Sequence, residues 1–83
     1  MPNEANGYNN RADYYLQIGN LEKALSDINT AIQLDKNYAP GYATRAEIYL
    51  KLNKKDKARK DVKKAIKLGL MTDDIFNLLD KCD

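Results

Sequence analysis

The sequence predicts an all-α fold of five helices, and three observations favour this class. The chain has 83 residues, 43% of them hydrophobic, with only two prolines and four glycines, which is typical of a folded domain and not of a disordered linker. Apolar residues recur at helical spacings of three and four, and the sequence repeats itself after 34 residues. At about half of the usual ~150 residues per domain, residues 1–83 form a single domain.

The internal repeat is the most informative feature. Residues 7–38 align with residues 41–72 without a gap, and 12 of the 32 aligned positions are identical. Each unit therefore holds two helices, whose small alanines allow close approach while tyrosine and leucine side chains fill the remaining space. We assign the repeated pairs at helical spacing to the core: Tyr8/Tyr42, Ala12/Ala46, Tyr15/Tyr49, Leu16/Leu50, Ala24/Ala58, Ala31/Ala65 and Ile32/Ile66.

The first four helices are bounded by breaks in the apolar pattern. Helices are expected over 5–18 and 21–35, because Gly19 and Asn20 interrupt the period between them. The third is expected over 39–52, with Pro40 in its first turn, and the fourth over 55–68, after a break at Asn53 and Lys54. Consecutive helices should run antiparallel. The segment before the first helix offers no matching cap, so the chain could begin inside a longer array.

A fifth helix is expected over 73–82, as the start of a third unit without its partner helix. Thr72 is a suitable N-cap, and Asp73 and Asp74 suit the positive end of a helix. Four apolar residues are expected to cover the preceding hairpin: Ile75, Phe76, Leu78 and Leu79.

The repeated unit resembles the tetratricopeptide repeat (TPR) family, whose 34-residue motif reads W-x2-L-G-x2-Y, A-x3-F and P. The matching residues are Tyr8-x2-Arg11-Ala12-x2-Tyr15 with Ala24-x3-Ile28, and Tyr42-x2-Arg45-Ala46-x2-Tyr49 with Ala58-x3-Val62. Arg11 and Arg45 replace the family's leucine, and Lys36 and Leu70 stand where its proline is expected. The resemblance implies antiparallel helical hairpins in a short right-handed solenoid: repeat 1 over 5–38, repeat 2 over 39–72 and a capping helix over 73–83.

The resemblance also implies a binding surface, because the first helix of each family hairpin lines a concave groove. The groove residues would be Asn6, Asn9, Asn10, Asp13, Gln17, Thr44, Glu47, Lys51, Asp74, Asn77 and Lys81. We therefore expect a non-enzymatic protein-interaction module that holds a peptide or partner helix in this groove. The alternative is a structural role, as an assembly unit or the C-terminal end of a longer array that stacks on another copy.

Some members of the family bind the Glu-Glu-Val-Asp tail of heat-shock chaperones through a clamp of two lysines, two asparagines and an arginine. The matching positions here are Asn9, Asp13, Thr44, Asp74 and Leu78. All three cations are missing and two carboxylates are present, so this tail is not an expected partner.

Charge is distributed unevenly along the chain. Residues 51–67 contain nine basic and two acidic residues, although the whole chain carries only +2. Lys55, Arg59, Lys63 and Lys67 recur every four residues and predict a basic ridge that faces water. A solubilising surface is the preferred interpretation over a dock for nucleic acid, anionic lipid or an acidic protein segment, because no aromatic or glycine-rich companions accompany the ridge.

Catalytic, metal and membrane functions have little support in the composition. The chain has no histidine and one serine, Ser26, so neither a catalytic site nor a metal or other cofactor is expected. Cys82 is expected to be an exposed terminal thiol without a function. No apolar stretch predicts a membrane span or a signal peptide, so the expected location is intracellular, in the cytoplasm. Two and a half repeats predict a monomer that dimerises weakly through its first hairpin.

Overall fold

The computed structural model describes residues 4–83, and residues 1–3 of the predicted 1–83 domain lie outside this range. Its elements are α1 (Glu4–Gln17), α2 (Leu21–Leu34), α3 (Ala39–Lys51), α4 (Lys55–Lys67) and α5 (Asp73–Lys81). The described residues contain no strand, and every helix boundary lies within one residue of its predicted position. The predicted all-α class is confirmed.

The turns form where the apolar period breaks. Gly19 adopts a left-handed conformation with φ of +84°, and Asn53, its equivalent 34 residues later, has φ of +60°. The side chains of Asn20 and Thr72 cap α2 and α5, accepting hydrogen bonds of 3.2 Å from the backbone N–H groups of Lys23 and Ile75. The predicted cap at Thr72 is therefore confirmed.

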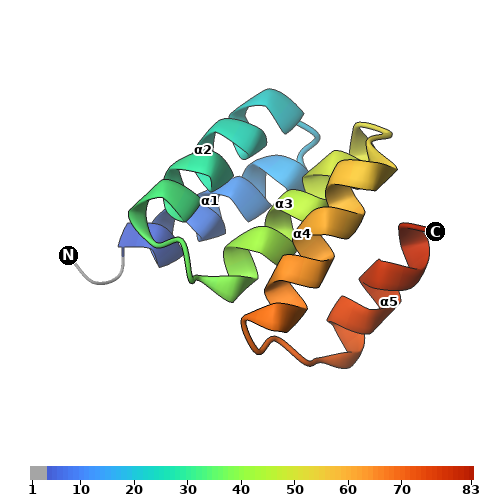
Figure 1. Cartoon of the computed structure of the whole chain (residues 1–83). Coiled ribbons are helices and arrows are strands. Elements are labelled where there is room, and N and C mark those ends of the chain that lie inside the picture. The colour runs from blue at the N-terminus through green and yellow to red at the C-terminus, as the bar shows by residue number, and fades with distance from the viewer. Residues whose placement is uncertain (1–3) are drawn as a thin grey trace.

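The helices pack as two antiparallel hairpins followed by a single helix (Figure 1). α1 pairs with α2 and α3 pairs with α4, while contacts of α3 with both α1 and α2 join the hairpins. α5 packs on α4 and α3. Among residues 4–83, no helix is both long and apolar enough to cross a membrane.

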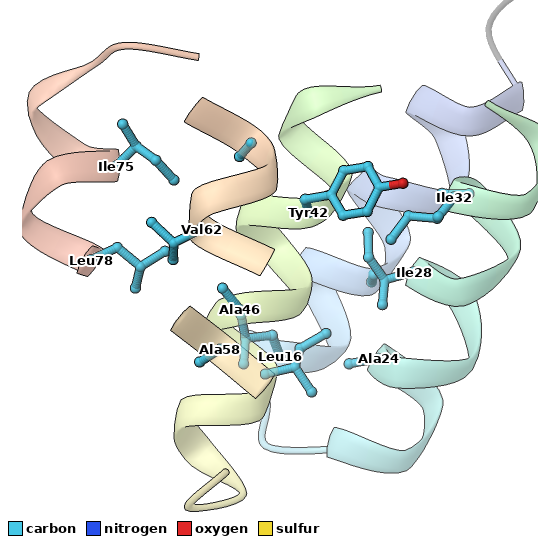
Figure 2. Close-up of a cluster of buried hydrophobic side chains, with 14 of the residues drawn as sticks. Leu16, Ala24, Ile28, Ile32, Tyr42, Ala46, Ala58, Val62, Ile75 and Leu78 are labelled. Carbon is cyan, nitrogen blue, oxygen red and sulfur yellow. The ribbon is translucent and has the colours of Figure 1, made fainter. Parts of the chain in front are cut away.

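The core follows the repeated alanines and the larger apolar residues around them. Six repeated alanines are fully buried: Ala12, Ala24, Ala31, Ala46, Ala58 and Ala65. Figure 2 shows the ring of Tyr42 beside Ile28 and Ile32 of α2, and Ile75 and Leu78 of α5 facing Val62 of α4. Close packing at small residues and filling by large ones produce one continuous core across the five helices.

Two predictions about the C-terminal helix are wrong. Phe76 was expected to cover the preceding hairpin but is 45% exposed. Its equivalent one repeat earlier, Tyr42, packs on α2 and is also covered by Lys64 of α4, and the described chain has no helix after α5 to cover Phe76 in the same way. Cys82 was expected to be exposed but is fully buried, with its thiol donating to the Leu78 carbonyl oxygen at 3.3 Å. It stands one repeat after Ile48, which is also fully buried.

Candidate functional site

The eleven predicted groove residues lie on the first helices of successive units, and we call their surface the α1–α3–α5 face. Five come from α1, three from α3 and three from α5. Nine of them are exposed, while Asn9 and Thr44 are half-buried where the helices meet. The face is therefore polar and accessible over most of its length.

Glu47 lies at the centre of this face. Its side chain reaches solvent, but its partial burial raises the pKa of the carboxyl above its ordinary value. The carboxylates of Asp13 on α1 and Asp74 on α5 raise this pKa further, while the ammonium groups of Lys81 and Lys51 oppose the increase. The structure thus brings together five of the predicted residues, with carboxylates from three different helices.

A small hollow of ≈ 190 Å³ opens beside Glu47, between α3 and α5. Thr44, Glu47, Thr72 and Asp74 supply its polar groups. Its apolar lining consists of Pro40, Ala43, Leu70, Ile75 and Leu78. The sequence analysis did not include the apolar lining in the groove, although Ala43 and Pro40 follow Glu47 backwards along α3 at helical spacing.

The α1 end of the face presents side-chain amides. Asn6 Oδ1 accepts a hydrogen bond of 2.8 Å from the hydroxyl of Tyr38, and Gln17 donates to Asp13 at 3.4 Å. Asn9 Oδ1 is buried and has no hydrogen-bond partner among the described residues. An unsatisfied buried acceptor lowers the stability of the fold, and because this oxygen is buried it is not exposed to a ligand on the face.

The four residues of the predicted basic ridge do not share one environment. Lys55, Lys63 and Lys67 are exposed, as expected. Arg59 is half-buried, and its guanidinium donates to the backbone carbonyl of Cys82 and lies 3.9 Å from the Asp83 carboxylate. The expectation that all four face water is therefore wrong for Arg59, because the end of α5 packs against it.

The α1–α3–α5 face combines hydrogen-bonding, charged and apolar groups. It offers amides, carboxylates, ammonium groups and a small apolar hollow. Within residues 4–83, no group of three or more His, Cys, Asp or Glu side chains is placed to hold a metal ion. Groups of these kinds form hydrogen bonds, ion pairs and apolar contacts.

Comparison with known protein families gives this architecture its class. Two models of the tetratricopeptide repeat match the chain, one over residues 5–38 and one over residues 39–68. The chain belongs to the tetratricopeptide repeat family, and its two repeats coincide with the α1–α2 and α3–α4 hairpins. Its class is therefore that of a protein–protein interaction module.

Two solved structures share the fold over most of this chain. One is the crystal structure of YrrB, a TPR protein with an unusual peptide-binding site, with a TM-score of 0.87 and 27% identity over 90% of this chain and 39% of that one. The other is the first TPR of Spaghetti (RPAP3) bound to the HSP90 peptide SRMEEVD, with a TM-score of 0.89 and 28% identity over 98% of this chain and 64% of that one. The chain thus spans less than two thirds of either structure. No curated protein sequence matches it.

Proposed function

We propose that the chain is a non-enzymatic module that binds a peptide or a partner helix on the α1–α3–α5 face. The observation that carries this proposal is the convergence of polar groups from three helices around the hollow beside Glu47. A ligand at this position would contact both hairpins and α5 at once. The Spaghetti (RPAP3) structure, which holds a peptide on the same fold, supports this use of the scaffold.

The charges of the face suggest the chemistry of the bound segment. Three carboxylates, from Asp13, Glu47 and Asp74, stand against the two ammonium groups of Lys51 and Lys81. A lysine or arginine of the partner would relieve the crowding of the carboxylates, and a neighbouring aliphatic side chain would fill the hollow. We therefore expect a partner segment that pairs a basic residue with an aliphatic one.

Selection from a displayed random-peptide library tests this function. The wild-type chain should enrich peptides with a basic residue next to an aliphatic one. Their binding should weaken about tenfold or more in the double variant Glu47→Gln/Asp74→Asn, a loss of roughly 1.4 kcal/mol. The matched control Glu22→Gln/Asp80→Asn removes two exposed carboxylates outside the face and should bind as the wild type does. Selected peptides that bind both variants equally would contradict the proposal.

A second candidate function, assembly with another copy, rests on the outer side of α1. Tyr14 and Ile18 are 59% and 58% exposed. Their equivalents one repeat later are Ile48, which is fully buried, and Leu52, which is half-buried. The first hairpin covers this side of α3. The equivalent side of α1 is exposed, and a second chain could pack against it.

Sedimentation velocity distinguishes this candidate from the leading one. A weak dimer that appears only at high concentration and disappears in Tyr14→Ser/Ile18→Ser is compatible with the peptide-binding module. The control variant Met71→Ser removes an apolar side chain that is 69% exposed elsewhere and should leave the association unchanged. A tight, obligate dimer would instead favour the assembly role.

A further inference from the structure

A second hollow lies along α3 and α4, and it is strongly cationic. It has a volume of ≈ 520 Å³ and is lined by six cationic side chains but only one carboxylate, that of Asp61. The cations are Arg45, Lys57, Lys60, Lys63, Lys64 and Lys67. We call this surface the lysine hollow. It shares only Lys63 and Lys67 with the predicted basic ridge, because Lys55 and Arg59 lie towards the end of α5.

The lysines of the hollow form a continuous stripe without compensating charges. Lys57, Lys60, Lys64 and Lys67 follow one another at spacings of three, four and three residues, so they share one side of α4 over about 15 Å. Like charges at these spacings repel one another. The single carboxylate in the lining is engaged by Arg45 through two hydrogen bonds of 2.8 Å, so the lysines have no acidic partner within the hollow.

Two tyrosine rings, those of Tyr42 and Tyr49, line the hollow, and the groups that cover them bear on which kind of anionic partner can bind. The rings of Tyr42 and Tyr49 are already covered by cations: Lys64 Nζ lies 6.0 Å from the centre of the Tyr42 ring, and Lys57 Nζ lies 5.7 Å from that of Tyr49. The guanidinium of Arg45 lies 5.5 and 5.8 Å from the same two rings. A nucleic-acid base that stacks on these rings would have to displace the cations.

The free donors of the hollow are ammonium groups. Arg45 is the only guanidinium in the lining, and its hydrogen bonds go to Asp61 and to Asn29 Oδ1. Bidentate recognition of a single carboxylate or phosphate is best supplied by a free guanidinium, so the hollow is not built around one such group. The remaining cations are ammonium groups on flexible stems, spread over a stripe instead of converging on one point, which suits several separate anionic groups along an extended chain. Because the covered tyrosine rings do not favour a nucleic acid, the carboxylates of an acidic peptide segment are the better match.

We infer that the lysine hollow is a docking surface for an acidic, Asp- and Glu-rich segment of a protein partner. An extended segment rises about 3.3 Å per residue, so some five residues would span the stripe. The carboxylates of the α1–α3–α5 face repel such a segment, whereas the lysine hollow attracts it. The chain would thereby present two surfaces of opposite preference, one for basic and one for acidic segments.

The first hairpin supplies a matched set of substitutions. The positions one repeat before Lys60, Lys63, Lys64 and Lys67 carry Ser26, Asn29, Thr30 and Gln33, all neutral residues that α2 already holds in a helix. The hollow variant is therefore Lys60→Ser/Lys63→Asn/Lys64→Thr/Lys67→Gln. The control variant is Lys23→Gln/Lys36→Gln/Lys54→Gln/Lys55→Gln, which neutralises four exposed lysines outside both the hollow and the α1–α3–α5 face. Each change removes four positive charges, so both variants carry −2 where the chain carries +2.

Fluorescence anisotropy with labelled octaglutamate tests the inference, with labelled oligothymidylate as the competing probe. At about 50 mM salt, where screening is weak, octaglutamate should bind the wild type and the control alike but bind the hollow variant about tenfold or more weakly. Circular dichroism establishes that each variant is helical. If the hollow variant unfolds, the double variant Lys63→Gln/Lys67→Gln replaces it. Its affinity for octaglutamate should be about threefold or more lower than that of the wild type.

Three results would overturn the inference. An equal loss of octaglutamate affinity in the hollow and control variants would mean that the peptide is attracted by the net charge of the chain and not by this surface. Tighter binding of oligothymidylate than of octaglutamate, with the same dependence on the lysines, would make the surface a nucleic-acid site. The absence of octaglutamate binding to the wild type at about 50 mM salt would show that the hollow binds no acidic segment.

Discussion

The guanidinium of Arg45 binds the carboxylate of Asp61 through two parallel hydrogen bonds of 2.8 Å, and this ties α3 to α4. The same pair occurs one repeat earlier, where Arg11 donates to Asp27 at 2.7 and 2.8 Å. Both aspartates are buried. Of these two arginines, only Arg45 makes a further hydrogen bond within residues 4–83, of 3.0 Å to Asn29 on α2, which joins the two hairpins. The arginine at the family's leucine position thus forms hydrogen bonds within its own repeat, and Arg45 also forms one to the preceding repeat.

Arg45→Gln should destabilise the fold more than Arg11→Gln does. The Arg45 side chain is 22% exposed and that of Arg11 is 59% exposed. Removing Arg45 leaves the buried Asp61 carboxylate without its cation and also breaks the link to α2, so we expect a loss of about 2 kcal/mol. Urea denaturation measures the free energy of unfolding of both variants. Equal losses would contradict a role for Arg45 in joining the hairpins.

Most of the fold was predictable because it follows local patterns. The helix boundaries follow from breaks in the apolar period, and the buried alanines follow from the 34-residue repeat. The repeat also contained a signal that the sequence analysis did not use: Arg11/Arg45 and Asp27/Asp61 are both conserved between the units, as expected for a paired arginine and aspartate. Cys82 could likewise have been placed in the core from its register with Ile48.

The surface features were less predictable, since they depend on how helices approach one another. A helical pattern places Lys55, Arg59, Lys63 and Lys67 along α4, but it does not say that the end of α5 packs on Arg59. The hollow beside Glu47 depends on the path of the α4–α5 loop through Leu70 and Thr72. Tyr42 and Tyr49 of α3 lie beside the α4 lysines in the folded chain, although they are distant from them in the sequence. The sequence around the lysines therefore gave no sign that aromatic rings lie next to them.

The partial burial of Glu47 and the nearby carboxylates of the α1–α3–α5 face should make stability depend on pH through Glu47. Its folded-state pKa lies above the ordinary value of 4.5, so the folded state holds this proton more tightly than the unfolded state does. Stability is therefore lost as the pH rises from about 4.5 through the folded-state pKa. Glu47→Gln should raise the melting temperature at pH 7 and have no effect near pH 3.5, below the ordinary value.

Thermal melts of the wild type, Glu47→Gln and the exposed control Asp80→Asn measure this dependence. The control should retain the wild-type pH profile. A destabilising effect of Glu47→Gln at pH 7 would show that the carboxylate is held by a favourable partner and that the charges of the face are assigned wrongly.

Burial should make Cys82 slow to react. The surrounding protein raises the pKa of its thiol, because burial disfavours the thiolate, and the thiol of the folded chain is inaccessible. Reaction with Ellman's reagent at pH 8 should be about tenfold or more slower in the folded chain than in denaturant, as the thiol reacts only after local opening of α5. Equal rates would place the thiol at the surface.

The face should refuse a chaperone-type tail ending in Glu-Glu-Val-Asp. Asn9, Asp13, Thr44, Asp74 and Leu78 supply no cation at the positions of the family's clamp, and Leu78 is buried. Each missing charge-assisted hydrogen bond costs about 1.5–3 kcal/mol. Calorimetry should detect no binding of such a peptide at high micromolar concentration. Low-micromolar binding that disappears when the terminal carboxylate is amidated would show that other groups form a clamp.

The position of the bound peptide tests the central claim most directly. An NMR titration of the isotope-labelled chain with a selected basic and aliphatic peptide reports which backbone amides sense the ligand. We predict chemical-shift changes concentrated on the α1–α3–α5 face, largest at Thr44, Glu47 and Asp74 around the hollow, with little change along the lysine stripe of α4. Changes confined to α4, or no saturable change anywhere, would contradict the proposal that this face binds peptides.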